Sequence, residues 1–289
     1  MIPPTFDYAV PKTLSEAISL LGQNPEAKIL AGGHSLIPMM RYRLASPALL
    51  VDINRIEGLN YIREEGGWLK IGAMTRESDL DESELIHAKY PLLADTAKMI
   101  ADPVVRNLAT VGGNLAHADP ANDHPATMLA YGAQVVAASP KGTRTIPIAD
   151  FFKGTFETAL AHDEVLTEIQ IPASQPRTGG CYLKIERKVG DYATAAVAVQ
   201  VSLDANGNCS YVGIGLTNVG LVPIKATAAE AALRGKAPTD DNIRAAATLA
   251  AAAADPSADP RGSEDYKRSL VKTLTVRALR QAVARAKGG

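Results

Sequence analysis

Two glycine pairs, Gly32-Gly33 and Gly112-Gly113, are the residues of this sequence best suited to holding a ligand. The first lies in Leu30-Ala31-Gly32-Gly33-His34-Ser35-Leu36, after a short apolar run, and the second in Thr110-Val111-Gly112-Gly113-Asn114. Because glycine has no Cβ, the backbone can approach an anion closely, and consecutive N–H groups can face it. Ser35, Thr110 and Asn114 would add side-chain donors. One diphosphate held between the two segments would account for both pairs; two plain tight turns are the alternative.

Other kinds of site are disfavoured by residue spacing. The first pair lacks the further glycine of a dinucleotide-binding G-x-G-x-x-G, and no G-K-[ST] phosphate loop occurs. Ser35 is not set in the G-x-S-x-G turn of a nucleophilic serine, so we assign no catalytic residue. His117, Asp119, Asp123 and His124 are clustered metal-binding residue types, but their spacing matches no known ligand pattern. We therefore predict no metal site and interpret the cluster as a polar loop near the ligand.

The composition is that of a folded chain with little net charge. Of the 289 residues, 46% are hydrophobic, enough for one large domain or several small ones. Lys and Arg number 30 against 31 Asp and Glu, with no basic block of the kind that binds nucleic acid. Two cysteines, Cys181 and Cys209, cannot by themselves ligate an iron–sulfur cluster and suit a reducing compartment. Without a signal peptide or a run of roughly 18 apolar residues, we expect a cytoplasmic protein with no transmembrane segment.

The elements that position the glycine pairs are predicted from hydrophobic periodicity and from cap and turn signals. Residues 1–57 should form an α/β unit, in which Thr13 and Glu16 open the first helix as a capping box. Its predicted helices cover 14–22 and 36–44, and its strands 28–31 and 49–53. Residues 58–174 should form a mixed α+β unit. Its predicted strands cover 68–73, 134–139, 143–148 and 165–171, and its main helices 84–100 and 126–131.

A polar segment at 174–180 leads into a third unit, which we assign to residues 175–289. Strands predicted over 195–203 and 209–217 flank Asn206-Gly207, the strongest short-range hairpin signal in the chain. Helices predicted over 242–254 and 264–286 should cover one face of this small antiparallel sheet.

Both glycine segments resemble those of a known family. The residues from Ala31 to Pro38, with Arg43-Leu44 and Leu50 to Ile53, are similar to the first FAD loop of the flavin subunits of molybdenum hydroxylases. The residues from Arg106 to Asn114, followed by Asp119-Pro120, are similar to their second FAD loop. The resemblance extends over nearly the whole chain. It implies an α+β fold, with a two-lobed FAD-binding domain of the PCMH/VAO flavin type and a C-terminal domain of a small antiparallel sheet and helices.

Within that family, two further segments resemble the carbon monoxide dehydrogenase branch. They are Lys188 to Ala196 and Ile214 to Val219, which are less specific than the FAD loops. In that branch the flavin chain is the medium subunit. A flavin subunit of a purine, nicotinate or aldehyde dehydrogenase is the serious alternative. A self-sufficient FAD oxidase or reductase and a flavin-free assembly subunit are the others.

The resemblance also implies roles for individual residues. Backbone amides of Gly32 to Ser35 and of Gly112 to Asn114 would hold the FAD diphosphate, and Asp123 would bind the adenosine end. The remaining implied contacts lie at the ring systems, with Lys184 stabilising negative charge on the reduced ring. The complete implied set is Leu30, Ala31, Gly32, Gly33, His34, Ser35, Leu36, Ile100, Ala101, Thr110, Gly112, Gly113, Asn114, Asp123, Leu166, Lys184, Asp191 and Tyr192.

The family membership would also imply partner chains. A large subunit would carry the molybdenum cofactor and oxidise carbon monoxide to carbon dioxide with water, and a small subunit would carry two [2Fe-2S] clusters. FAD in this chain would pass the electrons to an external acceptor, which could bring the complex to the inner face of the membrane. The assembly would be a dimer of heterotrimers. The cysteine count agrees with this division, because two cysteines cannot hold the clusters.

Overall fold

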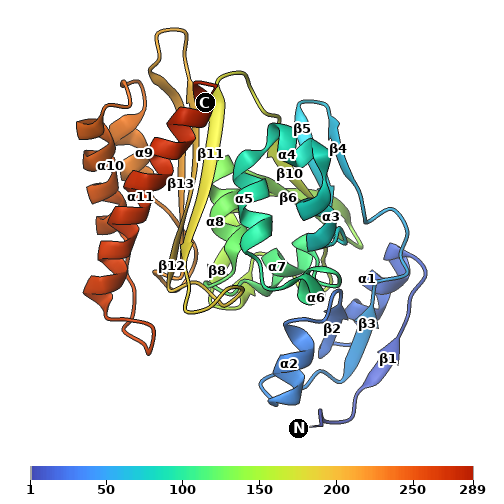
Figure 1. The fold of residues 1–289 in the computed structure, drawn as a ribbon. Helices are drawn as coiled ribbons and strands as arrows, with labels where there is room; N and C mark the ends of the chain where they lie inside the picture. Colours follow the sequence, from blue (N-terminus) through green and yellow to red (C-terminus); the bar gives the residue numbers. More distant parts are fainter. Residues whose placement is uncertain (1, 289) are drawn as a thin grey trace.

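The computed structural model describes residues 2–288, in which three main sheets follow one another along the chain (Figure 1). The first is parallel and three-stranded, in the order β1-β3-β2. Its elements are β1 (Asp7–Ala9), α1 (Leu14–Gln23), β2 (Ala27–Leu30), α2 (Leu36–Arg41) and β3 (Leu49–Asp52). The predicted capping box is confirmed, since Thr13 accepts from the amide of Glu16, whose carboxylate accepts from the amide of Thr13. Helix α1 buries Ala17, Ile18 and Leu21 against the sheet.

The second sheet is antiparallel, in the order β4-β5-β10-β6-β7. Its strands are β4 (Ile62–Glu65), β5 (Trp68–Gly72), β6 (Gln134–Ser139), β7 (Gly142–Pro147) and β10 (Val165–Pro172). The helices between β5 and β6 are α3 (Glu77–Glu82), α4 (Glu84–Lys89), α5 (Pro91–Met99), α6 (Pro103–Arg106), α7 (Val111–His117) and α8 (Asp123–Tyr131). A 3-10 turn (Ile148–Asp150) and a small hairpin of β8 (Phe152–Gly154) and β9 (Glu157–Thr158) follow β7.

The third sheet is antiparallel, in the order β11-β12-β13-β14, and lies between two helical layers (Figure 1). Its elements are β11 (Thr178–Ile185), β12 (Ala195–Leu203), β13 (Cys209–Thr217), β14 (Ile224–Lys225), α9 (Thr227–Leu233), α10 (Asp240–Ala253) and α11 (Glu264–Ala286). Helices α9 and α11 pack on one face, with α10 against both, and α5 and α8 pack on the other. A Cβ at Gly213 or Gly215 would meet the carbonyl oxygens of Ala130 or Ala126, so glycine allows α8 to lie directly on β13.

The structure departs from the predicted elements in several places. The helix expected over 84–100 is two helices, because Pro91 starts a new one and the preceding Tyr90 is non-helical, with φ −127° and ψ 62°. The polar segment at 174–180 already contains the start of β11, in which Gly179 and Gly180 pair with β12. The second glycine pair opens helix α7, where a loop was expected. Strands β1 and β4 and helix α9 were not predicted.

Within residues 2–288, every helix is too short or too polar to cross a lipid bilayer.

Candidate functional site

A cavity of about 660 Å³ brings together segments from all three sheets. Both glycine segments line it, as do the segments around residues 100, 123, 166 and 191. The predicted residues that line it are Ala31, Gly32, Gly33, His34, Ser35, Leu36, Ile100, Ala101, Thr110, Gly112, Gly113, Asn114, Asp123, Leu166, Asp191 and Tyr192. Leu30 and Lys184 lie outside the lining. A cavity of this volume falls in the usual range for cofactor sites, about 300–1,000 Å³.

The first glycine segment connects β2 to α2 and forms one wall of the cavity. Gly33 has a φ of +77°, a conformation that residues with a Cβ rarely adopt. Ser35 starts α2 without a side-chain cap, and the helical bonds begin with the amide of Ile37, which donates to the carbonyl of Gly33. The amides of Gly33 to Ser35 precede that bond, so they can face an anion in the cavity, as donors at a helix start do.

The two glycine segments touch each other. A Cβ added to Gly32 would lie 2.2 Å from the carbonyl oxygen of Leu108 and 2.8 Å from Cα of Ala109, both of them backbone atoms just before the second segment. Glycine at position 32 is therefore needed for the two walls to approach. This contact explains how segments far apart in the sequence form one cavity.

The second glycine segment differs from the expectation in how it could bind a ligand. Its three amides already donate within the protein: Gly112 to the carbonyl of Ala73 at 2.9 Å, Gly113 to the hydroxyl of Thr110 at 3.1 Å, and Asn114 to the carbonyl of Thr110 at 2.9 Å. Thr110 is the N-cap of α7, which consumes the donors that the sequence suggested for a phosphate. This segment therefore offers the cavity the side chain of Asn114 and close backbone approach.

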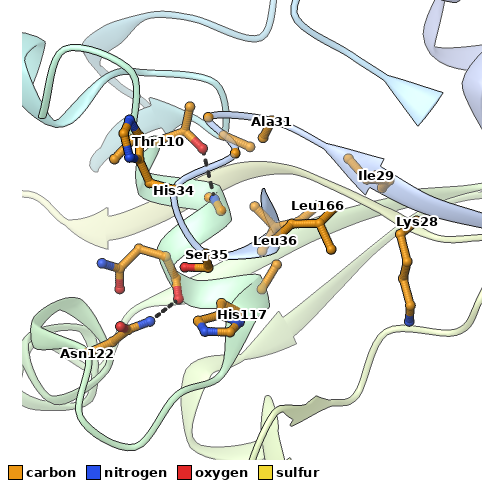
Figure 2. Close-up of a pocket in the computed structure, with 18 of the residues that line it drawn as sticks. Lys28, Ile29, Ala31, His34, Ser35, Leu36, Thr110, His117, Asn122 and Leu166 are labelled. Carbon is orange, nitrogen blue, oxygen red and sulfur yellow. Dashed lines mark hydrogen bonds between the residues drawn. The ribbon is translucent and has the colours of Figure 1, made fainter. Parts of the chain in front are cut away.

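Two buried polar atoms in the cavity lining have no partner within residues 2–288. They are Nε2 of His34 and Oδ1 of Asn114. The lining also contains Ser35, Asn122 and Asp123, whose side chains can hydrogen-bond with a ligand. Figure 2 labels His34, Ser35 and Thr110 among the side chains that line the cavity. The lining thus fits a ligand with phosphate, hydroxyl or amide groups.

The start of α8 forms another wall, which Asp123 and Asn122 line. The Asp123 carboxylate accepts from Tyr182 Oη at 2.5 Å and from Lys184 Nζ at 3.2 Å. Burial raises the pKa of Asp123, and the positive charge of Lys184 opposes that shift. Sequence reasoning missed Asn122, whose amide donates to the carbonyl of Asn114 at 2.8 Å (Figure 2). Asparagine is a preferred N-cap residue, and Asn122 directly precedes Asp123-His124-Pro125 at the start of α8. This pattern was the sequence signal that could have pointed to Asn122.

Lys184 lies behind the cavity lining and hydrogen-bonds to three of the segments around it. Its side chain is 1% exposed, and Nζ donates to the carbonyls of Met99 at 2.7 Å and Asp191 at 3.1 Å, besides Asp123. It also lies 3.2 Å from Oε2 of Glu186. It lies outside the lining, so its implied approach to a ligand stays a prediction. In the structure, its hydrogen bonds hold in place segments that do line the cavity.

Asp191 and Tyr192 reach the cavity from the loop between β11 and β12. Partial desolvation tends to raise the pKa of Asp191, but the amide of Tyr192 and the guanidinium of Arg187 outweigh it and lower the pKa. This carboxylate is therefore anionic at neutral pH. The Tyr192 side chain is 45% exposed, so it lies at the mouth of the cavity.

The four residues predicted to form one polar loop are placed in different environments. His117 lines the cavity and packs on Phe156 with ring centroids 5.0 Å apart, and burial lowers its pKa against the opposing charge of Asp119. His124 is completely buried in α8 and bonded to Glu77, so a polar loop was the wrong interpretation for it. Within residues 2–288, no group of three or more His, Cys, Asp or Glu side chains is arranged to hold a metal.

Known proteins resemble this chain over nearly its whole length. Residues 4–174 match the family described as the FAD binding domain in molybdopterin dehydrogenase, and residues 180–282 match the CO dehydrogenase flavoprotein C-terminal domain. The carbon monoxide dehydrogenase medium chain of Hydrogenophaga pseudoflava is 48% identical over 286 residues, which cover 99% of each chain. A chain in a solved structure of carbon monoxide dehydrogenase from Hydrogenophaga pseudoflava superposes with a TM-score of 0.96, at 51% identity and 99% coverage of both chains. The 6-hydroxypseudooxynicotine dehydrogenase complex subunit alpha of Paenarthrobacter nicotinovorans is 37% identical, over 99% of this chain and 97% of that one.

Proposed function

The chain belongs to the family of FAD-binding domains in molybdopterin dehydrogenases, and from this membership and the cavity we propose that it binds one FAD between its glycine segments. The family and the α+β fold with a flavoprotein C-terminal domain, both expected from the sequence, are confirmed. The observation that carries the proposal is the cavity itself. Both glycine segments line it, together with the polar side chains of His34, Ser35 and Asn114.

The proposed contacts follow from what each wall offers. The amides of Gly33 to Ser35 and the hydroxyl of Ser35 would hold the diphosphate. Asn114 would bond through its side chain. Asp123 would accept hydrogen bonds from hydroxyl groups at the adenosine end. Each of its carboxylate oxygens accepts one hydrogen bond within the protein and can accept another.

The ring systems would lie against the apolar parts of the lining. Ile100 is 6% exposed and Leu166 5% exposed, so both present apolar surface from a packed core. Ala101, beside Ile100, has a φ of +46°, a backbone conformation that disfavours bulky and β-branched side chains, so a small residue suits this part of the wall. Tyr192 would cover the mouth.

When bound, FAD can exchange electrons one at a time with metal clusters and pass them in pairs to an acceptor. The chain's own contribution is to bind and orient the cofactor and to set its surroundings. Lys184 places a buried positive charge behind the Asp123 wall, and its bonds to the carbonyls of Met99 and Asp191 fix two further walls. We assign no catalytic residue to this chain.

We further propose that this chain is the medium subunit of a carbon monoxide dehydrogenase. The identity of 48% to the Hydrogenophaga pseudoflava medium chain supports this choice over the related nicotine-derivative enzyme, at 37%. A large molybdenum subunit would oxidise the substrate, and a small subunit with two [2Fe-2S] clusters would relay electrons to FAD. We propose a dimer of such heterotrimers in the cytoplasm, which reaches an external acceptor at the inner face of the membrane.

The test is to purify the chain together with the polypeptides that accompany it from its native host. Its visible absorption spectrum is recorded, and the released chromophore is identified by chromatography. About one FAD per chain, with iron–sulfur absorption and two further polypeptides, is the expected result. An intact complex without flavin would show that the glycine segments are structural turns. Carbon monoxide oxidation by that complex, assayed against xanthine and nicotinate, tests the substrate separately.

A further inference from the structure

Glu77 and His124 form a completely buried pair that does not line the proposed cofactor site. Both side chains are 0% exposed, and Nε2 of His124 lies 2.7 Å from Oε2 of Glu77. Their other polar atoms, Oε1 of Glu77 and Nδ1 of His124, have no partner within residues 2–288. Such a pair is costly compared with apolar residues of the same shape. The pair lies between the starts of helices α3 and α8.

Glu77 is joined to the wall that carries the second glycine segment. It is the first residue of α3, and its amide donates to the carbonyl of Ala109 at 3.0 Å. The neighbouring Arg76 donates its guanidinium to the carbonyl of Leu108 at 2.5 Å and pairs with Thr110 as an antiparallel bridge. The start of α3 is therefore hydrogen-bonded to Leu108 and Ala109 and paired with Thr110.

His124 is joined to the opposite wall. It is the second residue of α8, directly after Asn122 and Asp123, which both line the cavity. The bond between His124 and Glu77 therefore connects the start of α8 to the start of α3. A hydrogen bond has a preferred length and direction, so it fixes this distance more narrowly than apolar packing would.

We propose that Glu77 and His124 are positioning residues, which hold the Asn122–Asp123 wall at a set distance from the 108–110 wall and thereby set the affinity of the cavity for FAD. This inference rests on the proposed FAD site. Neither side chain touches the cavity, so the pair acts through Asp123 and the second glycine segment. Asp123 is the link on one side, because it directly precedes His124 in α8.

The test compares three variants of the pair in the purified complex. Glu77→Gln keeps an acceptor for His124 and should leave FAD affinity unchanged. Glu77→Leu removes that acceptor and should weaken FAD binding by about tenfold or more, as removal of residues that orient a bound group does. The double variant Glu77→Leu with His124→Leu replaces the pair by apolar side chains. It should regain the Tm lost in the single variant but not the FAD affinity.

Thr127→Val is the matched control. Thr127 is also on α8 and completely buried, and its hydroxyl lies 2.7 Å from that of Thr96, away from the cavity lining. This variant should lower Tm without changing FAD affinity. Affinity is measured by titrating FAD into deflavinated complex and following flavin fluorescence, and the visible circular dichroism of the bound flavin reports its surroundings.

Two results would overturn the inference. One is a double variant that binds FAD as tightly as the unaltered complex, which would make the pair an ordinary part of the core. The other is a Thr127→Val variant that loses as much affinity as Glu77→Leu, which would reduce the effect to general destabilisation. If Glu77→Leu cannot be purified, the double variant alone decides. Absence of flavin from the unaltered complex would instead refute the proposed function, before any variant is made.

Discussion

Gly32→Ala should weaken both the fold and FAD binding, because this glycine allows the two cavity walls to touch. The added Cβ would lie 2.2 Å from the carbonyl oxygen of Leu108, whereas such a carbon–oxygen contact is normally about 3.4 Å. The walls must therefore separate by about 1 Å. Overpacking of this kind costs about 1–3 kcal/mol, which corresponds to about a 5- to 150-fold loss of affinity if it falls on the FAD-bound state. Gly32 has no left-handed backbone conformation, so the contact alone should cause the effect.

The assay is thermal unfolding and FAD titration of the deflavinated complex. Gly22→Ala is the control, since a Cβ there would be 4.0 Å from Cβ of Asp163, an ordinary contact. Gly22 lies in helix α1, so alanine should stabilise it by about 0.5–1 kcal/mol. Gly32→Ala should therefore lower Tm, whereas Gly22→Ala should raise it. A Gly32→Ala complex with unchanged Tm and unchanged FAD affinity would refute the close approach of the two segments.

Three further predictions concern buried polar groups. The pKa of Glu164 is lowered in the folded protein, chiefly by its hydrogen bonds to Arg144. The ionised carboxylate therefore contributes fully to stability above the pKa of glutamate in the unfolded chain, about 4.3. This contribution is lost as pH falls through the lower pKa of the folded state. Urea unfolding between pH 6 and pH 3 should show the advantage over Glu164→Gln disappear with acidification. Burial raises the pKa of Cys181 to about 12 and of Cys209 to about 11. Neither thiol should react with a disulfide reagent at pH 8 until the chain is denatured, and a thiol that titrates in the native complex would contradict this. Lys184→Met removes the cation that two buried carboxylates face and should cost about 3–5 kcal/mol in urea unfolding; a loss below 1 kcal/mol would show that water replaces it.

The regular elements could be predicted where local chemistry determines them. The capping box of Thr13 and Glu16 starts α1 at the expected residue, and the strands of the third sheet flank Asn206-Gly207 as predicted. The last helix, Glu264–Ala286, has the predicted bounds. In each case the signal is contained within a few neighbouring residues, so no tertiary contact was needed to find it.

The elements that were missed depend on partners distant in the sequence. Strand β1 contains only Asp7–Ala9 and exists because it pairs with β3, more than forty positions later. The sequence of Thr178–Gly180 resembles a linker, but these residues form a strand because they pair with β12. Glycine is needed at position 180, since a Cβ there would clash with Leu92 of α5. Short or glycine-rich strands carry little propensity of their own, so their pairing decides.

The site likewise combines features that local sequence predicts with features that depend on distant contacts. The two glycine segments could be predicted to share one site, but the sequence does not show which of their amide donors are already hydrogen-bonded within the protein. Lys184 was expected at the ligand because its charge suits a reduced ring, whereas its bonds to Met99, Asp123 and Asp191 hold it behind the wall. The pair Glu77 and His124 left no sequence signal, since the two residues come together only through the packing of α3 and α8.

The two glycine pairs therefore serve different purposes, although their sequences look alike. Gly33 has a left-handed φ in the segment whose amides we propose as phosphate donors, so the first pair would shape a donor surface. A Cβ at Gly112 would meet Cβ and the carbonyl oxygen of Ala73 at 2.6 Å, and one at Gly113 would meet the Thr110 hydroxyl at 2.6 Å. The second pair thus seats helix α7 on the end of β5 and closes its own N-cap. We therefore propose phosphate binding by amides for the first segment only, while Gly32 and the backbone before the second segment together allow the two walls to approach.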